Sequence, residues 1–130
     1  MFHHVELWVA DFTAAAPRWE WLVGELGWPR LSTWANGASW GSSDSGYLVV
    51  EQSSDVRGEL PHDRLRPGLN HVAFSAADRG VVDRIVQGAA DHGWTLMFGD
   101  RHPYAGGPEH YAAYLEDADG FEVELVARRP

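Results

Sequence analysis

The sequence predicts an α+β fold made of two βαβββ modules, whose strands form a concave, barrel-like mixed sheet with the helices on the outside. Three observations lead to this prediction. The order strand, helix, strands occurs twice within 130 residues, the opening strand motif recurs 67 residues later, and both predicted helices end near a Gly-Trp pair. Two copies of such a unit indicate a pair of modules rather than a solenoid, which needs at least three repeats.

The strongest repeat is the opening strand. The segment His4 to Asp11 (HVELWVAD) is repeated as His71 to Asp78 (HVAFSAAD). His, Val, Ala and Asp occupy the same four positions in both copies. A short apolar run that begins at Gly46 is matched by another that begins at Gly120. We therefore expect one domain over residues 1–130, with module one at about 1–53, a linker at about 54–69 and module two at about 70–130.

Hydrophobic period and turn residues place the elements of module one. Residues 2–9 alternate as a strand, and Asp11 can cap a helix that runs to about Leu26, where Gly27 ends it. Short strands follow near 30–35, 38–42 and 46–52. Asn36-Gly37 is typical of the hairpin turn between the first two of these strands.

Module two repeats this order. We expect a strand at 70–76, a helix from about Asp78 to Asp91, and strands near 94–98, 110–116 and 120–127. The stretch from Gly99 to Glu109 is rich in Pro and Gly. It is therefore predicted to be a loop, and a mobile one over a site, because binding residues concentrate in such segments.

The composition excludes several classes of function. Hydrophobic residues make up 45% and charged residues 22%, which is typical of a globular chain. The net charge of -9 disfavours nucleic acid and anionic lipid, and no apolar stretch approaches the ~18 residues of a membrane span. The chain has no Cys and its 10 basic residues are all Arg, which excludes disulfides, thiolate sites and lysine Schiff bases. We expect a soluble, cytoplasmic protein.

The aromatic content is unusual, with 7 Trp, 4 Tyr and 5 Phe in a short chain. These side chains could simply fill the core. Alternatively, they line a cavity for a flat or aromatic ligand, because an indole ring stacks and still offers an N–H donor.

Strand parity predicts which side chains share the face away from the helices. Alternate residues of a strand point the same way, so His4, Glu6 and Trp8 oppose an apolar set in the first strand. The matching strand turns His71, Ala73 and Ser75 to the equivalent face. In the last strand, Phe121, Val123 and Leu125 form the core set, which leaves Glu122, Glu124 and Val126 on the other side. Two imidazoles and a carboxylate could therefore converge in one cavity.

These motifs resemble those of the vicinal oxygen chelate superfamily, which includes glyoxalase I, extradiol dioxygenases, fosfomycin-modifying transferases and bleomycin-resistance proteins. The likeness lies in the opening strand HHVELWVAD, in the helix end Leu26-Gly27-Trp28 and in the final stretch DADGFEVEL. It covers essentially the whole chain as two βαβββ modules, and it is specific for the fold rather than for the reaction.

The resemblance implies a divalent metal bound by His4, His71 and Glu124. Imidazole and carboxylate suit Fe, Mn, Zn or Ni, and such a face leaves positions open for substrate or oxygen. Glyoxalase I uses a fourth ligand from the late strand of module one. Aligning Gly46 with Gly120 puts Val50 opposite Glu124, whereas a shift of one residue offers Glu51 as a possible fourth ligand. We prefer the set of three.

Tyr114 and His110 are the candidate catalytic residues. Tyr114 lies ten residues before Glu124, which resembles the spacing of the active-site tyrosine in extradiol dioxygenases, although His110 is nearer to it than in their pattern. Imidazole can carry protons near neutral pH. His62 and His92 are interpreted as solvated surface residues. The candidate ligand-binding residues share the predicted concave face: Glu6, Trp8, Ala73, Ser75 and Glu122.

Two classes of function remain. The first is a metal-dependent enzyme, of glyoxalase or dioxygenase type, that acts on a small oxygenated and possibly aromatic substrate chelated by the metal. The second is a protein of the bleomycin-resistance kind, which sequesters an aromatic drug or natural product without turnover. The resemblance also implies a homodimer, with the cavity closed either within one chain or across two.

Overall fold

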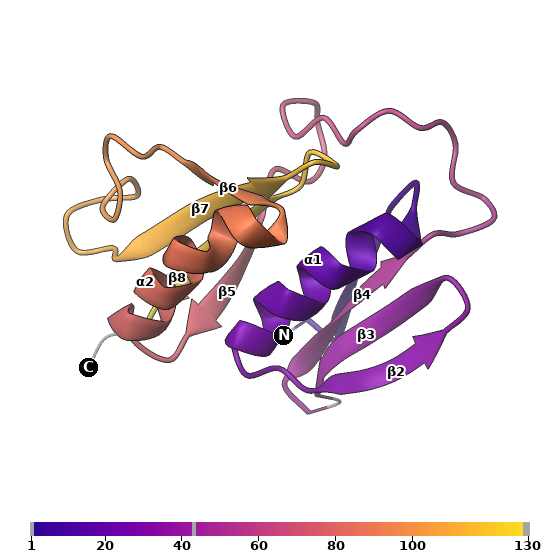
Figure 1. Ribbon diagram of the computed structural model, residues 1–130, viewed down its shortest axis with the longest axis horizontal. Coiled ribbons are helices and arrows are strands. Elements are labelled where there is room, and N and C mark those ends of the chain that lie inside the picture. Colours follow the sequence, from indigo (N-terminus) through magenta and orange to yellow (C-terminus); the bar gives the residue numbers. More distant parts are fainter. Residues whose placement is uncertain (1, 43, 129–130) are drawn as a thin grey trace. The chain divides into compact units, whose positions relative to one another are not determined.

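The computed structural model describes residues 2–42 and 44–128. It confirms the predicted α+β class with two βαβββ modules, each of which has one α-helix and one four-stranded mixed sheet (Figure 1). The chain divides into two compact units, Met1–Leu60 and Pro61–Pro130, which are called the first and second unit below.

The first unit contains the first sheet and its helix. Its elements are β1 (His4–Trp8), α1 (Phe12–Glu25), β2 (Arg30–Trp34), β3 (Gly37–Ser42) and β4 (Gly46–Glu51). The strand order is β1-β4-β3-β2, with β1 parallel to β4 and the other pairs antiparallel. The buried face of α1, which includes Trp19 and Leu22, packs on β3 and β4.

The second unit repeats this plan. Its elements are β5 (Val72–Ala76), α2 (Arg79–Gly88), the 3-10 helix η1 (Ala89–His92), β6 (Trp94–Met97), β7 (Ala112–Asp117) and β8 (Glu122–Ala127). The strand order is β5-β8-β7-β6, with β5 parallel to β8. Val82 and Ile85 are buried on α2, which packs on β5, β7 and β8.

Both α-helices begin at an aspartate. The Asp11 side chain accepts a hydrogen bond from the backbone N–H of Ala14 at 3.2 Å, and Asp78 accepts one from Val81 at 3.0 Å. Each carboxylate thereby satisfies an amide that has no partner within its helix. The second helix differs from the predicted range, because α2 ends at Gly88 and the chain continues as a 3-10 turn to His92. Glycine disfavours helix interiors, which explains the early end.

The predicted strand parity is confirmed in each sheet. Leu7 and Val9 of the first unit are buried, as are Phe74 and Ala76 of the second. His4, Glu6 and Trp8 are exposed on the other side of β1, and Ala73 and Ser75 are exposed on the other side of β5. We call the side of each sheet away from its helix the open face.

The segment before β5 packs on the sheet of its own unit, the second. The backbone N–H of His62 donates to Asp119 O at 2.7 Å, and the His62 ring stacks on Phe121 with centroids 5.0 Å apart. The interpretation of His62 as a solvated surface residue is therefore wrong. Gly120 makes this docking possible, since it has a φ of +83° and a Cβ there would lie 2.2 Å from the His62 carbonyl oxygen.

The strand registers show that the predicted alignment of the two modules, which matched Gly46 with Gly120, is wrong by one residue at Glu124. Glu124 pairs with Ala73, two residues after His71, whereas the residue that pairs with Glu6, two after His4, is Val49. Val49, not Val50, therefore occupies the position equivalent to Glu124. Val50 is fully buried on the helix side of β4.

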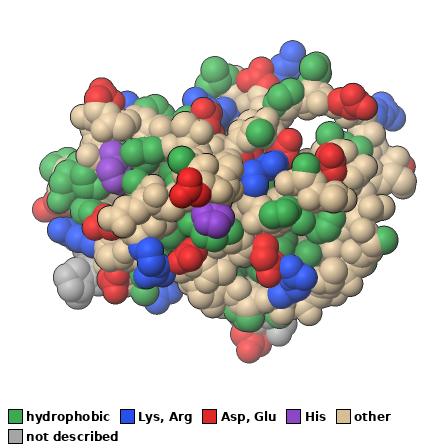
Figure 2. Space-filling model, in the orientation of Figure 1, with side chains coloured by type: hydrophobic (Ala, Val, Ile, Leu, Met, Phe, Trp, Pro, Cys, Tyr) green, Lys and Arg blue, Asp and Glu red, His purple; other side chains and the backbone are tan. Residues whose placement is uncertain are grey.

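Two features of the described residues concern helix length and surface charge. None of the described helices has the length and apolar character needed to cross a membrane. On the face drawn in Figure 2, Arg side chains stand among Asp and Glu side chains, and the described residues form no continuous basic surface there.

Gly120 and Gly24 provide a matched pair of substitutions. Gly120→Ala should lower the free energy of unfolding by about 2 kcal/mol or more, because it adds a left-handed penalty and a clash with the His62 carbonyl. Gly24→Ala lies in α1 with no atom near the added Cβ, so it should raise stability by roughly 0.5–1 kcal/mol. Denaturant unfolding of both variants checks this. Shifts of the same sign would contradict the role given to Gly120.

Candidate functional site

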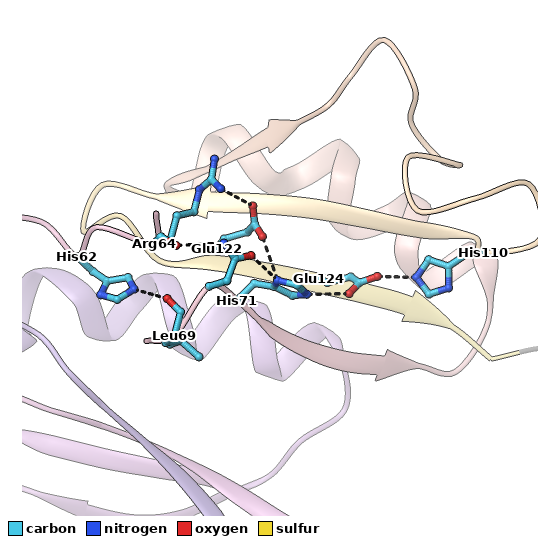
Figure 3. A network of polar contacts seen from close by, with 8 residues as sticks. His62, Arg64, Leu69, His71, His110, Glu122 and Glu124 are labelled. Carbon is cyan, nitrogen blue, oxygen red and sulfur yellow. Dashed lines mark hydrogen bonds and ion pairs between the residues drawn. The ribbon is translucent and has the colours of Figure 1, made fainter. Parts of the chain in front are cut away.

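Glu124 lies between His71 and His110 in the polar network of the second unit (Figure 3). It is only 7% exposed. His71 Nε2 lies 3.2 Å from its Oε2, and His110 Nε2 lies 2.5 Å from its Oε1. Tyr114 lies close enough to act on the same carboxylate, and the two groups shift each other's pKa. Both carboxylate oxygens therefore have partners, as a nearly buried charge requires.

The sheet positions these partners. Tyr114 on β7 is the direct neighbour of Glu124 in the antiparallel register. His71 precedes the first residue of β5, and His110 precedes β7 by two positions. The structure thus brings together His71, Glu124, Tyr114 and His110, four of the residues singled out from the sequence.

Glu122 holds the other side of the His71 ring. Its Oε2 lies 3.3 Å from His71 Nδ1, and its Oε1 lies 3.7 Å from Arg64 Nη1. The Asn70 side-chain oxygen is also 2.8 Å from His71 Nδ1. Acceptors at Nδ1 orient the imidazole and leave Nε2 directed at Glu124. Glu122, a predicted ligand-binding residue, is 5% exposed and lies beside Arg64 and His71.

Arg64 was missed from the sequence. It lies in the segment that had been assigned to the linker, where nothing in the local pattern distinguishes it from the other arginines. Its contact with Glu122 forms because residues 61–70 pack on the sheet of the second unit. Only the pairing of a buried carboxylate with some cation could have been expected in advance.

The network shifts two pKa values. Burial would raise the pKa of Glu124, but the hydrogen bonds from His110 and Tyr114 outweigh this and hold it below its usual range. Burial, followed by the hydrogen bond to Glu124, raises the pKa of Tyr114 to about 12. Tyr114 therefore stays protonated at neutral pH and acts as a donor, not as a base.

The loop between β6 and β7 packs on the same residues. A Cβ at Gly106 would lie 2.6 Å from the His110 ring and 2.8 Å from the Tyr114 hydroxyl, so only glycine lets the loop approach this closely. The loop also borders an open cavity of about 550 Å³. The cavity is lined by the end of the loop and the end of β8, namely Gly106, Gly107, Pro108, Glu109, His110, Tyr111, Val126 and Ala127. The expected loop is thus beside His110, and the role of Gly106 was not predicted.

The open face of the first unit carries His4. Its ring stacks on Tyr47, with centroids 4.9 Å apart and planes 7° from parallel, and its Nδ1 lies 2.8 Å from His3 Nδ1. Trp8 donates its indole N–H to Glu6 Oε2 at 2.7 Å, which agrees with the expected neighbourhood of Trp8 and Glu6. Glu51 accepts the indole N–H of Trp34 at 2.8 Å.

The donor chemistry fits a divalent metal. His71 Nε2 and Glu124 Oε2 already face each other within the second unit. A metal bound to both atoms would replace the direct contact between them. His4 offers a third nitrogen donor from the first unit. Within the described residues no three such side chains are grouped for a metal. The three-residue set therefore remains a prediction.

Comparison with known proteins identifies relatives along the whole chain. Residues 3–114 match the Glyoxalase/Bleomycin resistance protein/Dioxygenase superfamily. The Uncharacterized protein YqjT of Bacillus subtilis (strain 168) is 42% identical over 125 residues, which are 96% of this chain and 97% of that protein.

Solved structures give the same result. A candidate glyoxalase from Bacillus halodurans has a TM-score of 0.89 and 41% sequence identity, covering 98% of this chain and 96% of its own. A glyoxalase/bleomycin resistance protein from Albidiferax ferrireducens T118 has a TM-score of 0.77, with 20% identity and 99% of each chain covered. The second likeness is one of fold alone.

The raised pKa of Tyr114 can be measured. In a spectrophotometric titration of the metal-free protein, one tyrosine should ionise at about pH 12, and Tyr114→Phe should remove that step. Glu124→Gln should lower the pKa of Tyr114, because it removes a negative charge, yet leave it above 10.0, since burial persists. Tyr47→Phe is the control and should leave the step in place. A titration step near 12 that survives Tyr114→Phe would show that another tyrosine causes it.

Proposed function

Because this chain belongs to the glyoxalase/bleomycin resistance protein/dioxygenase superfamily, we propose that it is a metal-dependent enzyme of glyoxalase or dioxygenase type. Its substrate is a small oxygenated compound, and an aromatic one suits the exposed indoles. The ligands are His4, His71 and Glu124. The observation that carries the proposal is the convergence of His71, His110 and Tyr114 on the Glu124 carboxylate.

A divalent Fe, Mn, Zn or Ni ion held by these residues would supply a Lewis acid for two neighbouring oxygens of the substrate. The three-ligand set is supported by Val49, which occupies the module-one position equivalent to Glu124 and cannot coordinate. Glu51, the possible fourth ligand, already accepts a hydrogen bond from Trp34.

The chain's own side chains supply orientation and proton transfer. Glu122 and Asn70 hold His71 Nδ1 and so fix the direction of Nε2. His110 borders the open cavity and can accept a substrate proton or return it. Tyr114 keeps its hydroxyl proton at neutral pH and can turn it from Glu124 toward negative charge that develops on a substrate oxygen.

A second function, sequestration of an aromatic drug or natural product, is favoured by one observation. Trp8 is 43% exposed and Trp34 is 37% exposed, both on the first unit. Exposed indoles offer stacking surface that catalysis by itself does not need. The proposal also includes a homodimer, which sedimentation or native mass measurements would test.

Metal content tests the ligand set. Purified His71→Ala should lose stoichiometric metal, because a ligand is deleted, whereas His92→Ala should retain it, since His92 is exposed on η1. His110→Ala distinguishes a proton carrier from a ligand and should also retain the metal. Elemental analysis of the variants provides the measurement. Equal metal content in the His71 and His92 variants would refute the assignment.

Turnover separates the two functions. Oxygenated aromatic compounds should be incubated under air with Fe(II)-, Mn(II)- and Ni(II)-loaded protein, and their molecular masses should then be measured by mass spectrometry. For an enzyme, one compound changes mass, and Glu124→Ala abolishes the change because the only carboxylate ligand is lost. For a sequestering protein, the bound compound is recovered unaltered with every metal, and Glu124→Ala changes its affinity by less than about threefold, or ~0.7 kcal/mol.

A further inference from the structure

The open face of the first unit is built from side chains that suit a positively charged ligand. We propose that it binds an organic cation, such as a protonated amine or a quaternary ammonium group, in the cavity of about 370 Å³ beside Glu6 and Trp34. The inference rests on the proposed function in assigning this face to the ligand, and it adds the ligand's charge. It requires no bound metal.

Strand registers bring two indoles and a carboxylate into one row. Trp8, Glu51, Gly37 and Trp34 are successive neighbours across β1, β4, β3 and β2. The Trp34 indole lies over Gly37, where a Cβ would overlap it at 2.4 Å. Because Gly37 leaves this space, Trp34 reaches across β3 and donates to Glu51.

The adjacent row forms the cavity. Glu6, Val49, Ser39 and Ser32 are neighbours across the same four strands, and all four line the cavity together with Trp34. Ser39 is only 4% exposed, and among the described residues no hydrogen bond of its hydroxyl is found. Because Ser39 lines the cavity, its hydroxyl is available to a polar group of the ligand.

Among the residues that the structure describes, no arginine compensates the carboxylates of this face. Glu6 and Glu51 accept hydrogen bonds from indoles, and within the described part of the chain neither forms an ion pair with an arginine. The described residues that line the cavity include no Lys or Arg. A carboxylate without a cationic partner favours a cation and disfavours an anion, and the net charge of -9 adds attraction at longer range.

The aromatic rings strengthen the same preference. Trp34 and Tyr47 both line the cavity, and cations are attracted to the negative face of an aromatic ring. Trp34 donates its N–H to a carboxylate, which polarises the ring and makes its face more negative. The volume of about 370 Å³ lies within the range of small-molecule sites.

Binding of three matched probes to the metal-free protein tests the proposal. The probes are benzyltrimethylammonium, its uncharged carbon analogue with a tert-butyl group in place of the ammonium group, and phenylacetate. Isothermal titration, supported by quenching of tryptophan emission, gives the affinities. The cation should bind at least tenfold more tightly than the carbon analogue, and phenylacetate should bind most weakly.

Substitutions locate the binding. Glu6→Gln should weaken cation binding at least tenfold, which corresponds to about 1.4 kcal/mol, and should leave the carbon analogue unchanged. Glu59→Gln is the matched control, since it removes an equal charge from an exposed position outside the cavity. Trp34→Leu keeps an apolar contact but removes the ring, so it should weaken the cation more than the analogue.

Two results would overturn the proposal: equal affinity for the cation and its carbon analogue, or equal effects of Glu6→Gln and Glu59→Gln. Circular dichroism of each variant shows whether it is folded. Because the titrations use metal-free protein, their failure leaves the metal-site proposal standing. Conversely, His71→Ala should bind the cation normally, even though it is expected to lose the metal.

Discussion

The second unit is organised by the need to satisfy one carboxylate. Glu124 is nearly buried on β8, and a buried charge is stable only with close partners. His71, His110 and Tyr114 supply them from three separate parts of the unit, so the ends of β5 and β7 and the loop before β7 are fixed relative to one another. The same requirement recurs at Glu122, which draws Arg64 and the preceding segment onto the sheet.

The carboxylates on the open faces of the two units have chemically different partners. Carboxylates on the open face of the second unit have imidazole, guanidinium and phenol partners, which suits metal binding and proton transfer. Glu6 and Glu51 on the open face of the first unit have indole partners, which retain the negative charge and add aromatic surface. The two copies of the internal repeat thus carry different sets of polar and aromatic partners on their open faces.

Local sequence patterns predicted the elements and the parity of β1, β5 and β8. These features depend on residues close together in the chain or on a two-residue period. What failed depends on contacts between distant segments: the docking of His62 and Arg64, the approach of Gly106 to His110, and the one-residue register difference that brings Val49 to the position of Glu124. No single-residue signal marks such contacts in one sequence.

The central claim is that Glu124 is the carboxylate ligand of a metal whose nitrogen ligands are His71 and His4. Anomalous diffraction from crystals of zinc-loaded protein tests it most directly. The account predicts one strong peak within about 2.0–2.2 Å of His71 Nε2, of a Glu124 oxygen and of a His4 nitrogen, with His110 still hydrogen-bonded to Glu124 and outside the coordination sphere. A peak bound elsewhere, or a Glu124 that contacts only His110 and Tyr114 at saturating zinc, would contradict it.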